Sequence, residues 1–231
     1  MSHVYNVFPT TIYVGEVNDH KKHKEEFYKV YHKFDYEENK YDNTVSENTG
    51  KVLIHLEDTL NPLFEEIIYG HVRPYICDVL KYKDIFNYVI TKSWLSRTRK
   101  SNHCIPWHIH SPSQISFVYY LNMPPNAHKI KFCAPYNHWE PFLGISGSNR
   151  LEERCMVEEY NGLNSNTFEI LPPEGSIVLF PSRIQHTTKS IDKNFTGERL
   201  AIVGDIVLTL KEDLPMIHSM GFVDPRYWKQ Y

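Results

Sequence analysis

The chain has 231 residues, of which 41% are hydrophobic and 23% are charged; this composition suits a globular protein with a sizeable core and argues against general disorder. Its 25 Lys and Arg residues and 28 Asp and Glu residues give a formal net charge of -3, which argues against a protein dedicated to gripping a nucleic-acid backbone. We expect a single domain over residues 1–231, because this length fits one large domain and no Pro/Gly/Ser-rich linker interrupts it.

The N-terminal segment and the cysteines predict a cytoplasmic protein. The opening sequence, MSHVYNVFPTTIYVGEV, lacks both a basic region and a continuous apolar region, so we expect no signal peptide. No apolar run reaches the roughly 18 residues of a membrane span. The four cysteines lie far apart and form no CxxC pair, which argues against a disulfide framework or a zinc ribbon and favours a reducing compartment.

The first third of the chain predicts two helices. Asp19 to Tyr36 has apolar residues on one helical face and charges elsewhere, and the polar stretch Asn39 to Thr49 that follows predicts a loop. A second helix is expected to begin with Asn61 as its cap and Pro62 in its first turn. Pro74 should kink or divide that helix.

From Ile85 to Leu210 the sequence changes to short β-branched and aromatic runs separated by turn residues: YVITKSWLS, ISFVYYLNM, KIKFCA, GSIVLF and LAIVGDIVLTL. Both faces of ISFVYYL are apolar, which predicts a central strand covered on each side, as in a sandwich or a double-sheet barrel. We therefore expect a mainly β protein with N-terminal helices, in which residues 1–84 form a helical prelude with a short strand.

Two further segments are expected around this β core. Residues 136–166 show little periodicity and are rich in Asn and Gly, so they predict a long insertion of the kind that is usually functional or mobile. Residues 211–231 form a C-terminal extension.

A pair of histidines supplies the first chemical signal. His108 and His110 are two residues apart in PWHIHSP, so on an extended strand they would present two imidazoles to one ion. A third imidazole could come from His186, where the apolar strand GSIVLF runs into a turn, if the fold returns this distant strand to the first. An HxH pair by itself is a weak signal in a chain with 13 His.

Arg199 supplies the second signal. It opens the apolar strand RLAIVGDIVL, and a guanidinium among core residues is costly to bury without an anionic partner. Asp205 or a surface carboxylate could be that partner. The alternative is a bound carboxylate ligand, which the guanidinium fork matches with two hydrogen bonds.

The order of HxH, FVYYLN, GSIVLFPSxxxH and RxAI, from about Trp94 to Leu210, resembles the superfamily of iron(II)- and 2-oxoglutarate-dependent oxygenases. That resemblance implies a double-stranded β-helix core, of the jelly-roll or cupin-like type. By matching position, it makes His108, His110 and His186 the iron ligands.

The same resemblance assigns the cosubstrate site. A basic residue after the distal histidine binds the far carboxylate of 2-oxoglutarate in this superfamily, and that position is Arg199 here. The tract YYLN, residues 119–122, is similar to one in the prolyl-hydroxylase branch, which implies that Tyr120 hydrogen-bonds the same carboxylate. The cofactors implied are Fe(II) and 2-oxoglutarate.

The chain departs from the superfamily pattern at His110, where HxD or HxE is usual. Three neutral imidazoles leave a ferrous site at a formal charge of +2 instead of +1, which favours the anionic cosubstrate and stabilises high-valent iron less well. Alternatively, an outside carboxylate such as Glu140 or Asp205 binds the metal, and His110 becomes a hydrogen-bond donor around it.

The implied reaction consumes 2-oxoglutarate and molecular oxygen, releases succinate and carbon dioxide, and hydroxylates a C–H bond of an unidentified substrate. A peptidyl residue, a nucleotide or a small metabolite would all fit. Trp107, Gln114, Trp139 and the loop 136–166 are candidate substrate contacts.

Other functions also fit parts of the sequence. A cupin-like three-His metalloenzyme that does not use 2-oxoglutarate would explain His110 but leave Arg199 unexplained. A β-sandwich binding module would make the histidines incidental. Cys104 near the HxH pair permits zinc, although its spacing is no strong zinc pattern.

Overall fold

The computed structural model of the protein describes residues 3, 9–34, 36–41, 44–49, 53–134, 158, 161–190, 192–211, 222 and 224–230. In chain order its main elements are β1 (Tyr13–Glu16), α1 (His20–Val30), β2 (Tyr36–Tyr41), β3 (Thr44–Thr49), α2 (Asn61–Glu66), β4 (Phe86–Lys100), β5 (Ile115–Asn122), β6 (Lys129–Cys133), β7 (Thr167–Ile170), β8 (Ser176–Pro181), β9 (His186–Lys189) and β10 (Thr196–Leu210). Short 3-10 turns cover Tyr31–Lys33, Ile54–Leu56, Asp58–Leu60 and Pro225–Tyr227, and π-helical turns cover Ile67–Val72 and Tyr75–Val79.

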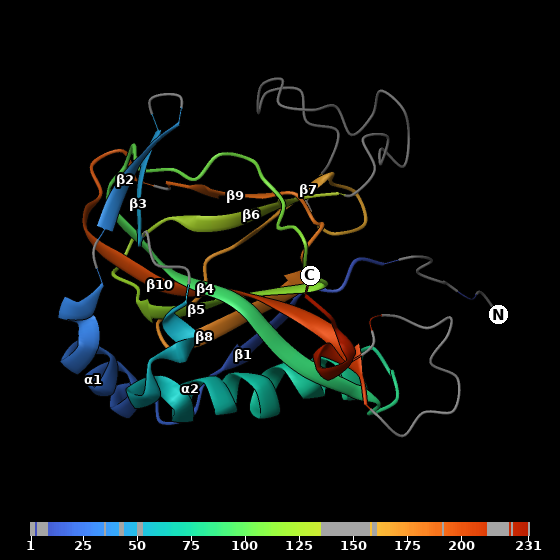
Figure 1. The fold of residues 1–231 in the computed structure, drawn as a ribbon. Coiled ribbons are helices and arrows are strands. Elements are labelled where there is room, and N and C mark those ends of the chain that lie inside the picture. Colours follow the sequence, from blue (N-terminus) through green and yellow to red (C-terminus); the bar gives the residue numbers. More distant parts are fainter. Residues whose placement is uncertain are drawn as a thin grey trace.

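The strands form two antiparallel sheets. The large sheet has the order β1-β8-β5-β10-β4-β3-β2, and the small sheet has the order β7-β6-β9. Figure 1 shows the small sheet on one side of the large sheet, and α1 and α2 on the other. The prediction of a mainly β protein with N-terminal helices and a double-sheet core is therefore confirmed.

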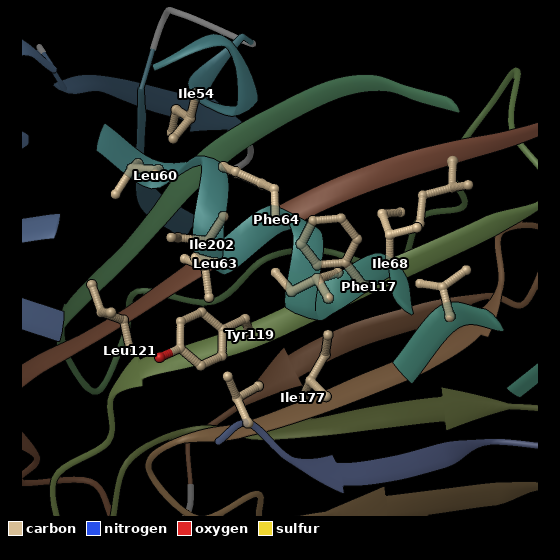
Figure 2. Packing of buried hydrophobic residues seen from close by; sticks show 14 of the residues in the cluster. Ile54, Leu60, Leu63, Phe64, Ile68, Phe117, Tyr119, Leu121, Ile177 and Ile202 are labelled. Atoms are coloured by element: carbon tan, nitrogen blue, oxygen red, sulfur yellow. The ribbon is translucent and has the colours of Figure 1, made fainter. Parts of the chain in front are cut away.

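The central strand β5 is buried on both of its faces, as its apolar sequence predicted. Phe117 and Tyr119 belong to the cluster that packs against the helices, and Figure 2 shows them beside residues of α2. Val118 and Tyr120 belong to a second cluster, shared with β6 and β8, on the opposite face. Because successive side chains of a strand alternate between its faces, β5 separates a helix-covered core from an interior between the two sheets.

The first predicted helix is shorter than expected, and the loop after it was predicted wrongly. Helix α1 ends at Val30 and is followed by the 3-10 turn, while β2 and β3 form a hairpin where a polar loop was expected. Glu47 and Asn48 of β3 pair with β4. A strand at a sheet edge is held by backbone hydrogen bonds and does not need an apolar run, so this hairpin had no signature in the hydrophobic pattern.

The second helix was correctly placed, but its predicted cap was wrong. Asn61 is the first helical residue; Leu60 occupies the cap position and its side chain makes no capping hydrogen bond. A 3-10 turn ending at Leu60 leads directly into the helix. Pro74 lies between the two π-helical turns and keeps a helical backbone; wider turns accommodate a residue that lacks an N–H group and crowds the preceding turn.

The predicted insertion at residues 136–166 and the C-terminal extension at 211–231 lie mostly outside the described residues, so the division of the chain at these points stays a prediction. Among the described helices, none combines the length and the apolar character needed to span a membrane.

Gly204 allows β10 to pass close to β5. A Cβ atom added at Gly204 would lie 2.4 Å from both Cε1 and Cζ of Phe117. Phe117 is fully buried in the helix-covered core and cannot move aside without disturbing its neighbours. The ring of Phe117 thus fills the space that any other residue at position 204 would need.

We expect Gly204→Ala to lower the free energy of unfolding by about 1 to 3 kcal/mol, because overpacking a close-packed core forces side chains and backbone to shift. Chemical denaturation of parent and variant measures this difference. Gly162→Ala is the matched control, because no atom lies within 4 Å of a Cβ built at Gly162. Equal stability of Gly204→Ala and the parent would contradict this account of the packing.

Candidate functional site

His108 and His186 are joined through their backbones. Each donates its N–H to the carbonyl of the other, with N to O distances of 3.0 Å in both directions, and Phe132 of β6 pairs with His186 on its other side. His108 therefore extends the edge of the small sheet by an isolated bridge, where a regular strand was predicted. This bridge brings His186, which is distant in sequence, next to His108, as a shared metal site requires.

His110 is held by the turn that follows β8. Its backbone N–H donates to the carbonyl of Ser182 at 2.9 Å. Its ring lies 5.3 Å from the ring of Trp94 and 6.3 Å from the ring of Phe180, centroid to centroid. Trp94 comes from β4 and Phe180 from β8, so the His110 side chain rests against the large sheet.

The three histidines predicted as ligands come together. One potential ligand atom from each of His108, His110 and His186 lies within 4.8 Å of the others, and the ring centroids are 4.2 to 5.2 Å apart. In the part of the chain that the structure describes, no other group of three or more His, Cys, Asp or Glu residues is so arranged. Cys104, which permitted a zinc site, is not part of this group.

The hydrogen bonds of the three rings leave one nitrogen of each for a metal. Nδ1 of His108 donates to the carbonyl of Pro106 at 2.8 Å, and Nδ1 of His186 donates to the carbonyl of Ile184 at 3.0 Å. Nδ1 of His110 donates to Oδ1 of Asp205 at 2.6 Å. Because a carbonyl or a carboxylate can only accept, each Nδ1 carries a proton, and Nε2 is the nitrogen that is left to face a metal.

Burial keeps two of these imidazoles in the form that binds metals. Desolvation, together with a smaller effect of the neighbouring His108, lowers the pKa of His186 to about 3. Desolvation also lowers the pKa of His108, although its hydrogen bond to Pro106 opposes the shift. Both rings are thus neutral at neutral pH, as a metal-ligating imidazole must be.

Asp205 does not pair with Arg199, the partner that the buried guanidinium suggested from the sequence. Its fully buried carboxylate accepts hydrogen bonds from His110 and, at 2.6 Å, from Ser116, and forms an ion pair with Nζ of Lys92 at 2.9 Å. Burial by itself raises the pKa of Asp205, but these partners outweigh it and hold the pKa below its usual value. Asp205 is therefore an ionised partner of His110, and the sequence did not reveal this contact.

Arg199 is buried without an anionic partner in the described part of the chain. It is 2% exposed, and its Nε and Nη1 atoms have no hydrogen-bond partner there. The guanidinium carbon lies 5.1 Å from the centroid of the Tyr120 ring, and the Tyr120 hydroxyl is also buried and unpartnered. Such a group of unsatisfied donors fits an anion.

Thr98 is a further residue of this region that sequence reasoning missed. It pairs with Arg199 across β4 and β10, and its buried hydroxyl has no hydrogen-bond partner among the described residues. No signal in the sequence could have found it, because only the register of two strands distant in sequence places it opposite Arg199.

The residues predicted to contact the substrate differ in their exposure and in their contacts. Trp107, next to His108 in sequence, is 43% exposed, and Ile109 on the other side of His108 is 46% exposed. The amide oxygen of Gln114 accepts from the backbone N–H of Leu208 at 3.1 Å, which gives Gln114 a structural contact with β10. Trp139 lies outside the described residues, as does Glu140.

Three solved structures share this fold. A Pseudomonas putida prolyl-4-hydroxylase is 9% identical and superimposes with a TM-score of 0.53 over 86% of this chain and 92% of that one. A Trichoplax adhaerens prolyl hydroxylase, in complex with a peptide fragment of hypoxia inducible factor, is 12% identical, with a TM-score of 0.54 over 85% and 83%. HygX from Streptomyces hygroscopicus, with nickel and 2-oxoglutarate bound, is 13% identical, with a TM-score of 0.53 over 94% and 92%.

These likenesses show the double-stranded β-helix fold, and a family model identifies the chain more specifically. No curated protein matches the chain. Residues 92–205 match the family described as putative 2OG-Fe(II) oxygenase, and this range contains the three clustered histidines, Tyr120 and Arg199. The β core of the chain, residues 92–205, therefore belongs to the iron(II)- and 2-oxoglutarate-dependent oxygenases.

Proposed function

We propose that this oxygenase hydroxylates a C–H bond of its substrate, with iron held by His108, His110 and His186. The observation that carries this proposal is the three-His cluster, in which each Nδ1 is occupied by an acceptor and each Nε2 is free for a metal. Iron together with 2-oxoglutarate supplies, in the presence of oxygen, the oxidant for such a reaction.

The chain's own residues bind and orient the cosubstrate. We assign the far carboxylate of 2-oxoglutarate to the guanidinium of Arg199 and to the hydroxyl of Tyr120, whose buried donors are unpartnered in the described chain. Thr98 supports the same assignment through its hydroxyl. The buried apolar residues around Tyr120, such as Val118 and Phe180, keep bulk water from the site, which strengthens these electrostatic contacts.

The alternative of a cupin-like metalloenzyme without 2-oxoglutarate is not favoured. It leaves the buried guanidinium of Arg199 without a role, and the family match points to 2-oxoglutarate. Measuring succinate formed from 2-oxoglutarate, with and without candidate peptides, nucleotides and small metabolites, tests the function and identifies the substrate class. Absence of iron-dependent succinate under every condition would contradict it.

The location of the protein stays a prediction. Cys77, Cys104 and Cys133, the cysteines of the described chain, are free thiols. This is compatible with the reducing cytoplasm that the sequence favoured.

We expect His186→Ala to weaken binding of iron by more than about 100-fold, because loss of a mere outer-sphere partner typically costs about 10- to 100-fold. Anaerobic titration of the metal-free protein with Fe(II) measures this affinity. His32→Ala is the matched control, because His32 is exposed in the 3-10 turn after α1. Iron affinity of His186→Ala equal to that of the parent would show that His186 is not a ligand.

We expect Arg199→Met to weaken binding of 2-oxoglutarate by about two orders of magnitude or more, since loss of a buried charged partner costs about 3 to 5 kcal/mol. Calorimetric titration with 2-oxoglutarate in the presence of a non-reactive divalent metal measures the effect, while metal affinity should persist. The exposed Arg183 provides the control variant Arg183→Met.

Stability separates this role from a structural one. Because Arg199 leaves donors unpaired in the described chain, Arg199→Met should not lower the unfolding temperature of the cosubstrate-free protein. A large loss of stability with unchanged affinity for 2-oxoglutarate would instead indicate that Arg199 acts within the fold.

A further inference from the structure

The three clustered histidines differ in the charge of the groups that receive their Nδ1 protons. His108 and His186 donate to backbone carbonyls, which are neutral. His110 donates to the carboxylate of Asp205, at the short distance of 2.6 Å. A hydrogen bond to an ionised acceptor is stronger than one to a neutral acceptor, so His110 is the ring most tightly held and the richest in electron density.

Three neighbouring side chains hold the carboxylate of Asp205 in this position. Its Oδ1 accepts from both His110 and Ser116, each at 2.6 Å, and its Oδ2 faces Nζ of Lys92 at 2.9 Å. The carboxylate itself is fully buried. These contacts place Asp205 behind the His110 ring, as its hydrogen-bond acceptor.

The charge of Asp205 is only partly offset by its ion pair. The side chain of Lys92 is 32% exposed, whereas that of Asp205 is fully buried. Water screens an exposed charge far more than a buried one. The ion pair as a whole therefore leaves a negative electrostatic potential at the His110 ring.

We propose that Asp205 is a positioning residue that supplies one negative charge next to this metal site, acting through the imidazole of His110. In a two-His-one-carboxylate site the carboxylate binds the metal itself. Here the histidine stands at that place in the motif, and the carboxylate lies one imidazole further out. This inference rests on the proposed role of the three histidines as metal ligands, and does not depend on 2-oxoglutarate.

The variant Asp205→Asn tests the proposal, because asparagine keeps the shape and an oxygen that can accept from His110 but removes the charge. We expect its affinity for Co(II) and for anaerobic Fe(II) to be about 10- to 100-fold weaker than that of the parent. Asp224→Asn is the matched control: Asp224 is also a buried carboxylate that accepts hydrogen bonds, from Asn87 and Arg226, but it lies outside the site. An affinity of Asp205→Asn within twofold of the parent would overturn the proposal.

The reduction potential of bound iron gives a readout that a merely structural role of Asp205 would not predict. Removing a negative charge close to the metal destabilises Fe(III) relative to Fe(II), so Asp205→Asn should raise the potential. Ser116→Ala removes one hydrogen bond to Asp205 but leaves the charge, and should shift the potential by much less. A lowered or unchanged potential in Asp205→Asn would contradict the proposal.

The outcomes also separate this inference from the proposed function. If the parent binds neither Fe(II) nor Co(II), the three-His site fails and the role of Asp205 fails with it. If the parent binds metal and Asp205→Asn binds it equally well, the function stands and the role of Asp205 is wrong. Thermal unfolding of each metal-free variant shows whether a loss of affinity reflects loss of the fold.

Discussion

The alternation of side chains along the central strands is the constraint on which the rest of this structure depends. In β5, residues that face the helices are aromatic or aliphatic, and the residues between them face the interior between the sheets. The first set supplies the hydrophobic free energy that holds α1 and α2 against the large sheet. The second set can then include polar groups such as Ser116 and Tyr120, because the stability of the sheet does not rest on them alone.

The interior between the sheets combines stable packing with polar groups that lack partners. Apolar residues such as Val178 and Phe132 are buried there. Arg199 and Tyr120 are buried there too, but they have hydrogen-bond donors without an acceptor among the described residues. An unsatisfied buried donor costs about 1 to 3 kcal/mol, and more when it is charged. These donors are available to a ligand, because no carboxylate of the described chain pairs with them. Binding of an anionic cosubstrate would offset the free-energy cost of burying them.

In the proposed metal centre the motif has changed, but a carboxylate remains close to the three histidines. His110 replaces the usual carboxylate of the motif, and Asp205 stands behind it from a strand far away in the chain. Charge acts over several ångströms in a buried site with a low dielectric constant. A carboxylate can therefore contribute without touching the metal, provided that a polarisable imidazole lies between them.

The sequence by itself determined the elements whose signal is local: the apolar runs of the core strands, the HxH spacing of His108 and His110, and the position of Arg199 at the start of an apolar strand. Strand periodicity, which acts over a few residues, placed His108 and His110 on one side of a strand, while the resemblance to the oxygenase superfamily implied the roles of His186, Arg199 and Tyr120. Only the tertiary structure decided the β2–β3 hairpin, the placing of Thr98 opposite Arg199, and the choice of His110 as the partner of Asp205. These features depend on the pairing and register of strands that are distant in sequence. Backbone hydrogen bonds and packing together fix that register, and no local sequence pattern encodes it.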